Sequence, residues 1–217
     1  MYLSSHPLDK YEFEMKNFTT CEMANLPNFI SECELAKKPA KVCIAGLVTE
    51  YKPLLTKKGS PYSRTMLEDY SGSYELTLFS KDHEAYFSYM VPHSALFIEG
   101  AIEEKYGLRP EERAQGKTVP YVFKVKSVTM LGNVCEGMIK SFGINIETPM
   151  LTPEFRKGLV SVIKSHAGKI PLEVFFYDPE TRYRIQLKSN KFQVAVSTEL
   201  INDLRRLGVD QYEVTLK

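Results

Sequence analysis

A basic stretch, residues 51–64, is the segment whose residue types best suggest a binding chemistry. It contains no Asp or Glu, and its basic side chains are Lys52, Lys57, Lys58 and Arg64. Ammonium and guanidinium groups at this spacing can neutralise phosphates along a nucleic-acid backbone, and the ring of Tyr62 can stack on a base. A solvated hairpin tip is the alternative interpretation, because short basic loops are common on protein surfaces.

A second group of basic residues falls in the polar segment 106–118. Two adjacent acids, Glu111 and Glu112, lower the positive charge of this segment, and a plain surface loop is the alternative interpretation for most of its residues. The side chains predicted to extend the nucleic-acid contact are Tyr106, Arg109, Arg113 and Lys117.

No residues with the spacing of a catalytic site occur in the chain. Glu68 and Asp69 are adjacent carboxylates, but successive side chains of a strand face opposite ways, so the two cannot converge on one substrate. Asp69 also precedes Tyr70-Ser71-Gly72, which suits a turn. Phosphate-binding loops, dinucleotide fingerprints, nucleophile elbows and zinc-protease motifs are absent from the sequence. The sequence therefore predicts that this chain has no catalytic activity.

Cysteine and histidine spacing predicts neither a metal site nor disulfides. No CxxC or HxxxH pair occurs, and a chain of 217 residues can build a core without covalent staples. We expect reduced thiols, no structural metal and no cofactor. The four cysteines are Cys21, Cys33, Cys43 and Cys135.

Composition and charge place the chain among soluble globular proteins. Its hydrophobic fraction is 43%, no apolar run is long enough to cross a membrane, and the first residues lack the order of a signal peptide. We therefore expect a cytoplasmic protein without membrane contact. The net charge of +1 provides no global attraction to nucleic acid, so any such contact must come from a local patch.

Hydrophobic periodicity predicts an OB fold over residues 41–131, preceded by a helical and irregular connector over residues 1–40. A period-two pattern starts at Lys41, and Ser80 can cap a helix that ends before Pro92. Gly100 is expected to bend one strand. Three strands, a helix and two strands are the order of this barrel. The strands after the first are expected at 62–69, 74–79, 95–104 and 121–131.

A small α+β domain is predicted over residues 141–217, after a linker at 132–140. Thr152 before Pro153 is typical of a helix start, and Thr198 can cap a second helix that runs to Gly208. The strands of this domain are expected at 142–147, 172–177, 183–188, 192–196 and 212–216.

Several motifs together resemble one family. They include Thr56-Lys57-Lys58-Gly59, Leu67-Glu68-Asp69-Tyr70-Ser71-Gly72-Ser73, Leu96-Phe97-Ile98-Glu99-Gly100 and the opening Met1-Tyr2-Leu3-Ser4-Ser5-His6-Pro7-Leu8. With these in the same order over all 217 residues, the chain resembles the alpha subunit of bacterial DNA polymerase III, from just after its clamp-binding region to its C-terminus. Ser5 stands where the family usually has Gly, and Arg64 where it usually has an apolar residue.

The resemblance implies a non-catalytic region of a DNA-directed DNA polymerase, a nucleotidyltransferase. Its OB fold would lie near the incoming single-stranded template, and its last domain would bind the clamp-loader tau subunit within the polymerase holoenzyme. The last helix and strand, Thr198 to Lys217, are the surface expected to bind this partner. The alternative is a protein-interaction module that does not contact DNA. The residues predicted to bind the partner are Leu200, Leu204, Arg205 and Tyr212.

Overall fold

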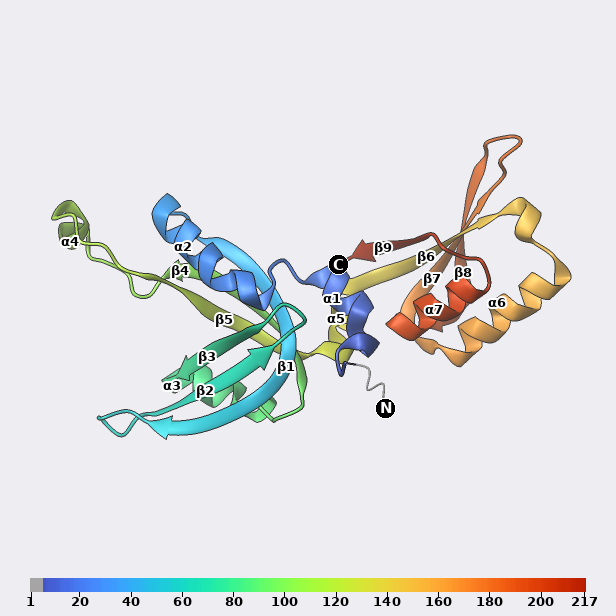
Figure 1. The fold of residues 1–217 in the computed structure, drawn as a ribbon. Coiled ribbons are helices and arrows are strands. Elements are labelled where there is room, and N and C mark those ends of the chain that lie inside the picture. Colours follow the sequence, from blue (N-terminus) through green and yellow to red (C-terminus); the bar gives the residue numbers. More distant parts are fainter. Residues whose placement is uncertain (1–5) are drawn as a thin grey trace. The chain divides into compact units, whose positions relative to one another are not determined.

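The computed structural model describes residues 6–217, with the side chain of Arg113 excepted. These residues form two compact units (Figure 1). The first unit consists of Met15–Leu131 with Asp9 and the described residues before it, and the second of Lys10–Glu14 with Gly132–Lys217. The predicted opening motif lies in part, at residues 1–5, outside the described residues.

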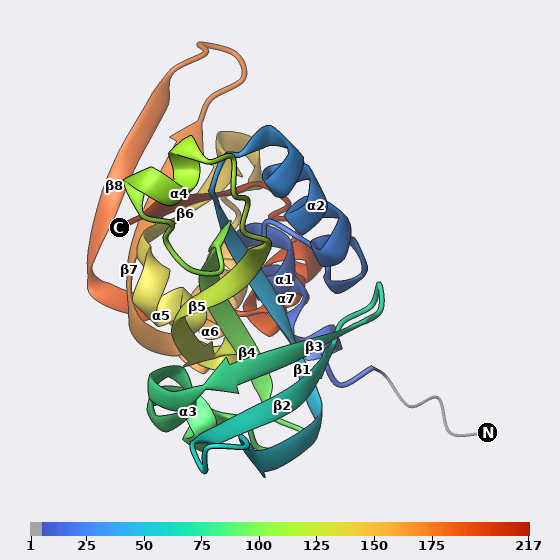
Figure 2. The ribbon, with the colours of Figure 1, turned by 90° about the vertical axis from the view of Figure 1, so that its left-hand side faces the viewer.

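The first unit is built on a five-stranded antiparallel sheet with the strand order β3-β2-β1-β4-β5 (Figure 2). Helix α3 (Ser80–Tyr86) and the 3-10 helix η3 (Phe87–Tyr89) connect β3 to β4. Three strands, a helix and two strands in this order form the predicted OB fold, which is confirmed. The strands are β1 (Ala40–Leu55), β2 (Pro61–Glu68), β3 (Ser73–Phe79), β4 (Ala95–Glu104) and β5 (Tyr121–Met130).

Strand β1 is 16 residues long because it pairs with two neighbours in succession. Its first half pairs with β4 and its second half with β2, and the two ladders meet at Leu47. A register shift between Val48 and Glu50 marks a β-bulge, which bends the strand from one neighbour to the other. The bend lets β1 pair with both β4 and β2.

A second bulge lies opposite the predicted bend at Gly100, and its extra residue, Lys126, belongs to β5. The register of β4 with β5 shifts between Glu99 and Gly100. A Cβ atom on Gly100 would lie 2.4 Å from Cε2 of the Phe123 ring, so a larger residue could not pack here without moving β5. Glycine is therefore needed for the close approach of this ring to the strand.

Much of the predicted connector belongs to the core of the first unit. Helix α2 (Leu26–Ala36) lies against β4 and β5, and Met23, Leu26 and Cys33 are buried in the barrel core. The backbone N–H of Thr20 donates to the carbonyl of Cys43 at 2.8 Å, which ties the connector to β1. The preceding elements are η1 (Asp9–Tyr11), α1 (Glu12–Phe18) and η2 (Met23–Asn25).

Asp69 has the structural role predicted for it. Its Oδ1 accepts hydrogen bonds from the backbone N–H groups of Ser71 at 2.8 Å and Gly72 at 3.1 Å. Its Oδ2 accepts from the N–H of Met23 at 2.9 Å, at the start of η2. This carboxylate therefore closes a turn and holds the connector on the barrel.

The second unit contains a four-stranded sheet with the order β8-β7-β6-β9. Strands β6 and β7 are parallel and are connected through α6, whereas the other neighbours are antiparallel. Its strands are β6 (Ile139–Glu147), β7 (Ala167–Tyr177), β8 (Arg184–Val194) and β9 (Tyr212–Leu216). Its helices are α5 (Val134–Met138), α6 (Pro153–Ser165) and α7 (Thr198–Arg206), with η4 (Leu131–Asn133) and η5 (Thr148–Met150) as short 3-10 helices.

One helix start was predicted correctly, and two were wrong. Oγ1 of Thr152 accepts a hydrogen bond from the N–H of Phe155 at 3.1 Å, as expected for the N-cap of α6. The cap of α7 is Ser197 rather than Thr198, because Oγ1 of Thr198 instead accepts from the N–H of Phe13 at 2.9 Å. Ser80 is the first residue of α3, with a φ of 44°, and does not cap it.

Two further features of the second unit differ from the sequence prediction. Strand β8 runs without a break through the two strands expected at 183–188 and 192–196. The expected linker at 132–140 instead contains α5 and the start of β6, and its Val134 and Cys135 side chains are buried. Apolar side chains in this segment gain more by packing than by remaining in solvent.

A carboxyl group lies buried beside α5. Glu14 of α1 is 3% exposed, and its Oε2 makes no hydrogen bond with any described residue. Burial raises the pKa of Glu14 to about 7, because a carboxylate there would lose its hydration. Burial also raises the pKa of the neighbouring Cys135 thiol, so both groups are neutral in the folded unit at low pH.

We expect the free energy of unfolding of the second unit to fall as the pH rises. The folded pKa of Glu14 exceeds its ordinary value of 4.5, so the folded state binds this proton more tightly, and the stabilisation is lost between about pH 4.5 and 7. The loss should amount to about 3 kcal/mol. Urea unfolding at pH 5 and pH 8, followed by circular dichroism, measures it.

Glu14→Gln should abolish this pH dependence, because the amide keeps the shape of the side chain without an ionisable proton. Glu12→Gln, which changes an exposed neighbour on the same helix, is the matched control and should retain it. An equal pH dependence in the Glu14→Gln variant and the unaltered chain would contradict the assignment.

Candidate functional site

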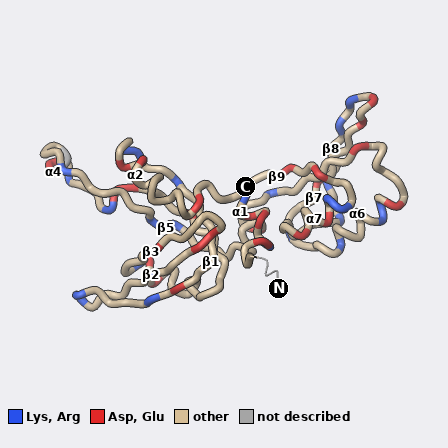
Figure 3. The backbone as a smooth tube through the Cα atoms, in the orientation of Figure 1, with Lys and Arg blue, Asp and Glu red and all other residues tan. Residues whose placement is uncertain are grey.

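The predicted basic stretch forms the hairpin between β1 and β2. Lys57 and Lys58 lie at its tip, are exposed, and make no ion pair with any described residue. Figure 3 shows the tip in blue with no acidic segment beside it. The N–H of Thr56 donates to the carbonyl of Ser60 at 2.9 Å, and Gly59 adopts a φ of 78°, so the turn is tightly closed. The backbone of the turn therefore places Lys57 and Lys58 next to each other at the tip.

Two other predicted cations are paired with acids. Nζ of Lys52 lies 2.6 Å from Glu50, and Nε of Arg64 lies 3.7 Å from Glu75. These pairs are about half exposed, and such pairs contribute roughly 0 to 1 kcal/mol each. A phosphate could therefore replace either carboxylate at little cost, but the local positive charge is lower than the acid-free stretch of sequence suggests.

Tyr62 lies in a stack of two rings. Its ring centroid is 5.3 Å from that of Phe79, and the rings are inclined by 15°. Tyr62 is partly buried, whereas Phe79 is 52% exposed, so Phe79 offers the larger free face for a base. Phe79 was not among the residues predicted to bind nucleic acid. The burial of Leu76 and Leu78 in β3 is the signal that could have placed Phe79 outside.

The register of β1, β2 and β3 brings these side chains onto one surface. Lys52 lies opposite Arg64, and Tyr62 lies opposite Phe79, whereas the alternate residue Ser63 is fully buried. We call the outer surface formed by Lys52, Tyr62, Arg64 and Phe79 the barrel face. The outer face of strands 2 and 3, with the loop between strands 1 and 2, is the surface with which OB folds bind oligonucleotides.

The structure does not bring the second predicted group to the hairpin tip. The segment after β4 contains a short helix, α4 (Pro110–Ala114), and Figures 1 and 2 both show α4 apart from the tip of the β1–β2 hairpin. Tyr106 and Arg109 are exposed, and Lys117 pairs with Glu112 at 3.3 Å. The side chain of Arg113 lies outside the described part of the chain.

Two residues predicted to bind a partner serve the core instead. Leu200 and Leu204 of α7 are 1% and 2% exposed, so their apolar side chains are already covered within the second unit. Tyr212 is partly buried, with its ring centroid 5.7 Å from that of Phe142. Arg205 is exposed and is the one member of this set that lies fully on the surface.

Among residues 6–217, no group of three His, Cys, Asp or Glu side chains is arranged to hold a metal ion. Over the same residues, no helix has the length and apolar character needed to cross a bilayer.

Comparisons with known proteins relate the whole chain to one family. A family model described as the DNA polymerase III alpha subunit, C-terminal domain, matches residues 142–213. The DNA polymerase III subunit alpha of Vibrio cholerae is 25% identical over 99% of this chain. The chain is similar to the C-terminal region of the DNA polymerase III alpha subunit.

Other DNA polymerase III alpha subunits match over the same extent. The subunit from Saccharopolyspora erythraea is 27% identical over 100% of this chain, and that from Escherichia coli K12 is 22% identical over 99%. The chain spans 17% of the length of each of these three relatives.

Among solved structures, the mitochondrial single-stranded DNA-binding protein Rim1 of S. cerevisiae is similar, with a TM-score of 0.29 and 14% identity, over 42% of this chain and 95% of that one.

Proposed function

We propose that the first unit binds single-stranded DNA through the hairpin tip and the barrel face. The observation that carries this proposal is that the hairpin tip with Lys57 and Lys58 leads into the strand pair in which Tyr62 lies opposite the exposed Phe79. Lysines can neutralise the phosphates of a strand while the ring stacks on a base. Neither interaction depends on the identity of the base, so we propose binding without sequence preference.

The proposed binding is weak and depends on salt. Lys52 and Arg64 must exchange a carboxylate for a phosphate, so they contribute less than the two lysines at the tip. With two to four phosphates neutralised, the logarithm of the association constant should fall with a slope of about −1.4 to −2.8 against the logarithm of the salt concentration. Weak, sequence-tolerant contact suits a template strand that must move past its polymerase.

We further propose that the second unit binds a partner protein, the clamp-loader tau subunit, within the polymerase holoenzyme. Similarity to the DNA polymerase III alpha subunit supports the polymerase context, and the surface of α7 around Arg205 is the proposed contact. We propose that DNA synthesis belongs to other parts of the whole protein, since this chain spans 17% of the length of its relatives. We also propose that the protein acts in the cytoplasm.

A purely structural role for the first unit is the second candidate function. The pairing of Lys52 with Glu50 and of Arg64 with Glu75 favours it, because these pairs reduce the positive charge of the barrel face. In that case, neither removal of the tip lysines nor removal of the exposed ring would change any DNA affinity.

Lys57→Ala combined with Lys58→Ala should weaken binding to a labelled single-stranded oligonucleotide about tenfold at 0.1 M salt and flatten the salt slope by about 1.4. Fluorescence anisotropy at two salt concentrations measures both quantities. Lys38→Ala with Lys41→Ala removes the same charge from exposed positions outside the proposed surface and is the matched control. Equal affinities for the two double variants would contradict the proposed site.

Phe79→Ala should reduce the same affinity at least about fivefold, because stacking on one base contributes roughly 1 to 3 kcal/mol. The salt slope should not change, since no charge is removed. Phe79→Tyr preserves the ring and should bind like the unaltered chain. Loss of affinity in both variants would show that the position tolerates no change, and loss in neither would show that no base stacks there.

Arg205→Glu should weaken the association with the cognate tau subunit about tenfold in titration calorimetry, because it reverses an exposed charge at the proposed contact. Arg156→Glu reverses an exposed arginine on α6 and serves as the control. Unaltered binding by the Arg205→Glu variant would place the contact on another surface of the protein.

A further inference from the structure

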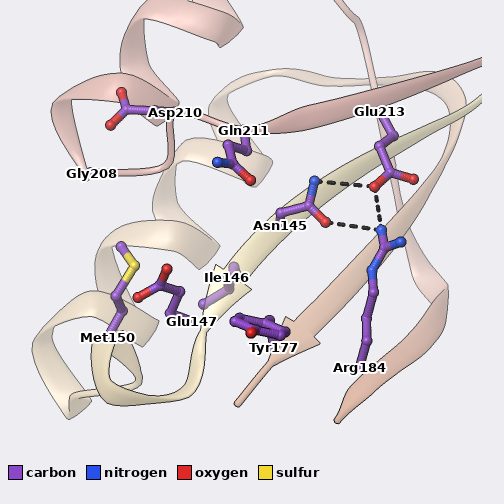
Figure 4. A pocket seen from close by; sticks show the side chains of 10 residues that line it. All are labelled: Asn145, Ile146, Glu147, Met150, Tyr177, Arg184, Gly208, Asp210, Gln211 and Glu213. Atoms are coloured by element: carbon purple, nitrogen blue, oxygen red, sulfur yellow. Dashed lines mark hydrogen bonds and ion pairs between the residues drawn. The ribbon is translucent and has the colours of Figure 1, made fainter. Parts of the chain in front are cut away.

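A pocket of about 580 Å³ opens at the carboxyl ends of the parallel strands β6 and β7 (Figure 4). Ligands commonly bind at this end of parallel strands, where the connecting loops leave a crevice. The loop between α7 and β9 forms the opposite wall. The lining consists of Asn145, Ile146, Glu147, Met150, Tyr177, Arg184, Gly208, Asp210, Gln211 and Glu213.

The loop between α7 and β9 is held in place by contacts with β6 and Met150. The N–H of Asn145 donates to the carbonyl of Gln211 at 3.0 Å, which ties the loop to β6. Gly208 adopts a φ of 85°, a conformation that favours glycine, and a Cβ atom there would lie 3.4 Å from Cε of Met150. Backbone contacts therefore position the loop that forms this wall.

A hydrogen-bond network closes one side of the pocket, and it includes the one guanidinium group of the lining, that of Arg184. Arg184 donates through Nη2 to Oδ1 of Asn145 at 3.1 Å and to Oε1 of Glu213. Its guanidinium carbon also lies 4.0 Å from the centre of the Phe175 ring. Figure 4 shows Arg184, Asn145 and Glu213 joined on this side, with Glu147 and Met150 across from them. Arg184 is therefore already neutralised and does not attract an anion.

The charge that remains in the pocket is negative. Glu147 and Asp210 are exposed and make no ion pair with any described residue. Met150 and the partly exposed ring of Tyr177 add apolar surface to the lining. Carboxylates beside an aromatic ring and a thioether suit a cation that carries an aliphatic stem. A divalent metal fits less well, because no group of three metal-binding side chains exists within the described residues.

We propose that this pocket receives a lysine or arginine side chain of a protein partner. The charged head pairs with Glu147 and Asp210, and the stem lies against Tyr177 and Met150. This inference rests on the proposed docking role of the second unit, and it adds the chemistry of the partner's anchor. The anchor is a basic residue in an accessible segment, and Arg205 is not among the residues that line the pocket.

The first test uses a capped Gly-Arg-Gly tripeptide and isotope-labelled protein in nuclear magnetic resonance titrations. We expect saturable shifts of the amide signals of Tyr177, Asp210 and Gln211. A capped Gly-citrulline-Gly tripeptide, which has nearly the same shape without the charge, should bind at least tenfold more weakly. Equal responses to the two peptides, or no saturable response to either, would overturn the proposal.

Glu147→Gln combined with Asp210→Asn should weaken binding of the arginine tripeptide at least tenfold. Both residues are exposed, so this variant is expected to fold, and unchanged dispersion of the remaining signals verifies that it does. Glu154→Gln with Glu199→Gln removes two exposed carboxylates elsewhere in the unit and should leave binding unaltered. Spermidine is titrated in parallel, and saturable binding of spermidine without binding of the peptide would overturn a protein anchor.

Titration with the tau subunit separates this inference from the docking role. Weaker tau binding by the Glu147→Gln, Asp210→Asn variant supports the pocket as the anchor site. If tau binds this variant and the unaltered chain equally, docking stands and the pocket proposal fails. If tau does not bind the unaltered chain but the arginine tripeptide binds in the pocket, the tau proposal fails and a basic anchor from another protein is supported.

Discussion

The bulge in β1 determines which side chains the first unit presents to solvent. Before the bulge, the even-numbered residues of β1 face the core, as the full burial of Ile44 and Val48 shows. After it, Tyr51 packs against the core and Lys52 lies outside. One inserted residue thus reverses the parity of the strand. Without it, Lys52 would point into the barrel, and Tyr51 would take its place opposite Arg64.

The change in which residues of β1 face the core also illustrates why part of the fold could be predicted from the sequence and part could not. The residue pattern and the flanking turn residues located β4 and β9 to the residue. The bulge was not predicted, because it depends on the pairing of β1 with β2, which the residue pattern of β1 alone does not record. Thr198 was assigned as a helix cap for a similar reason. Its bond to the N–H of Phe13 joins residues 185 positions apart, and no local pattern records it.

The candidate site was predictable where it depended on local charge. The exposure of Lys57 and Lys58 could be predicted because they lie in a turn sequence without Asp or Glu. The carboxylate partner of Arg64, by contrast, comes from the neighbouring strand β3, which composition does not reveal. Leu200 and Leu204 fall on the apolar face of a helix, and such a face looks the same in sequence whether it covers a core or binds a partner. Their burial shows that these two leucines belong to the core of the second unit.

The run Lys10–Glu14 belongs to the second unit, although the chain before and after it belongs to the first. Within the second unit, Phe13 is buried and hydrogen-bonded to Thr198, and Gly132 lies against the ring of Tyr11. The second fold is therefore discontinuous in sequence. A fragment that starts at residue 132 would lack part of the core of the second unit, and one that ends at residue 131 would retain residues 10–14 without the residues that Tyr11 and Phe13 contact. Circular permutation, or a fusion that restores residues 10–14 to the C-terminal piece, is the route to expressing the two units apart.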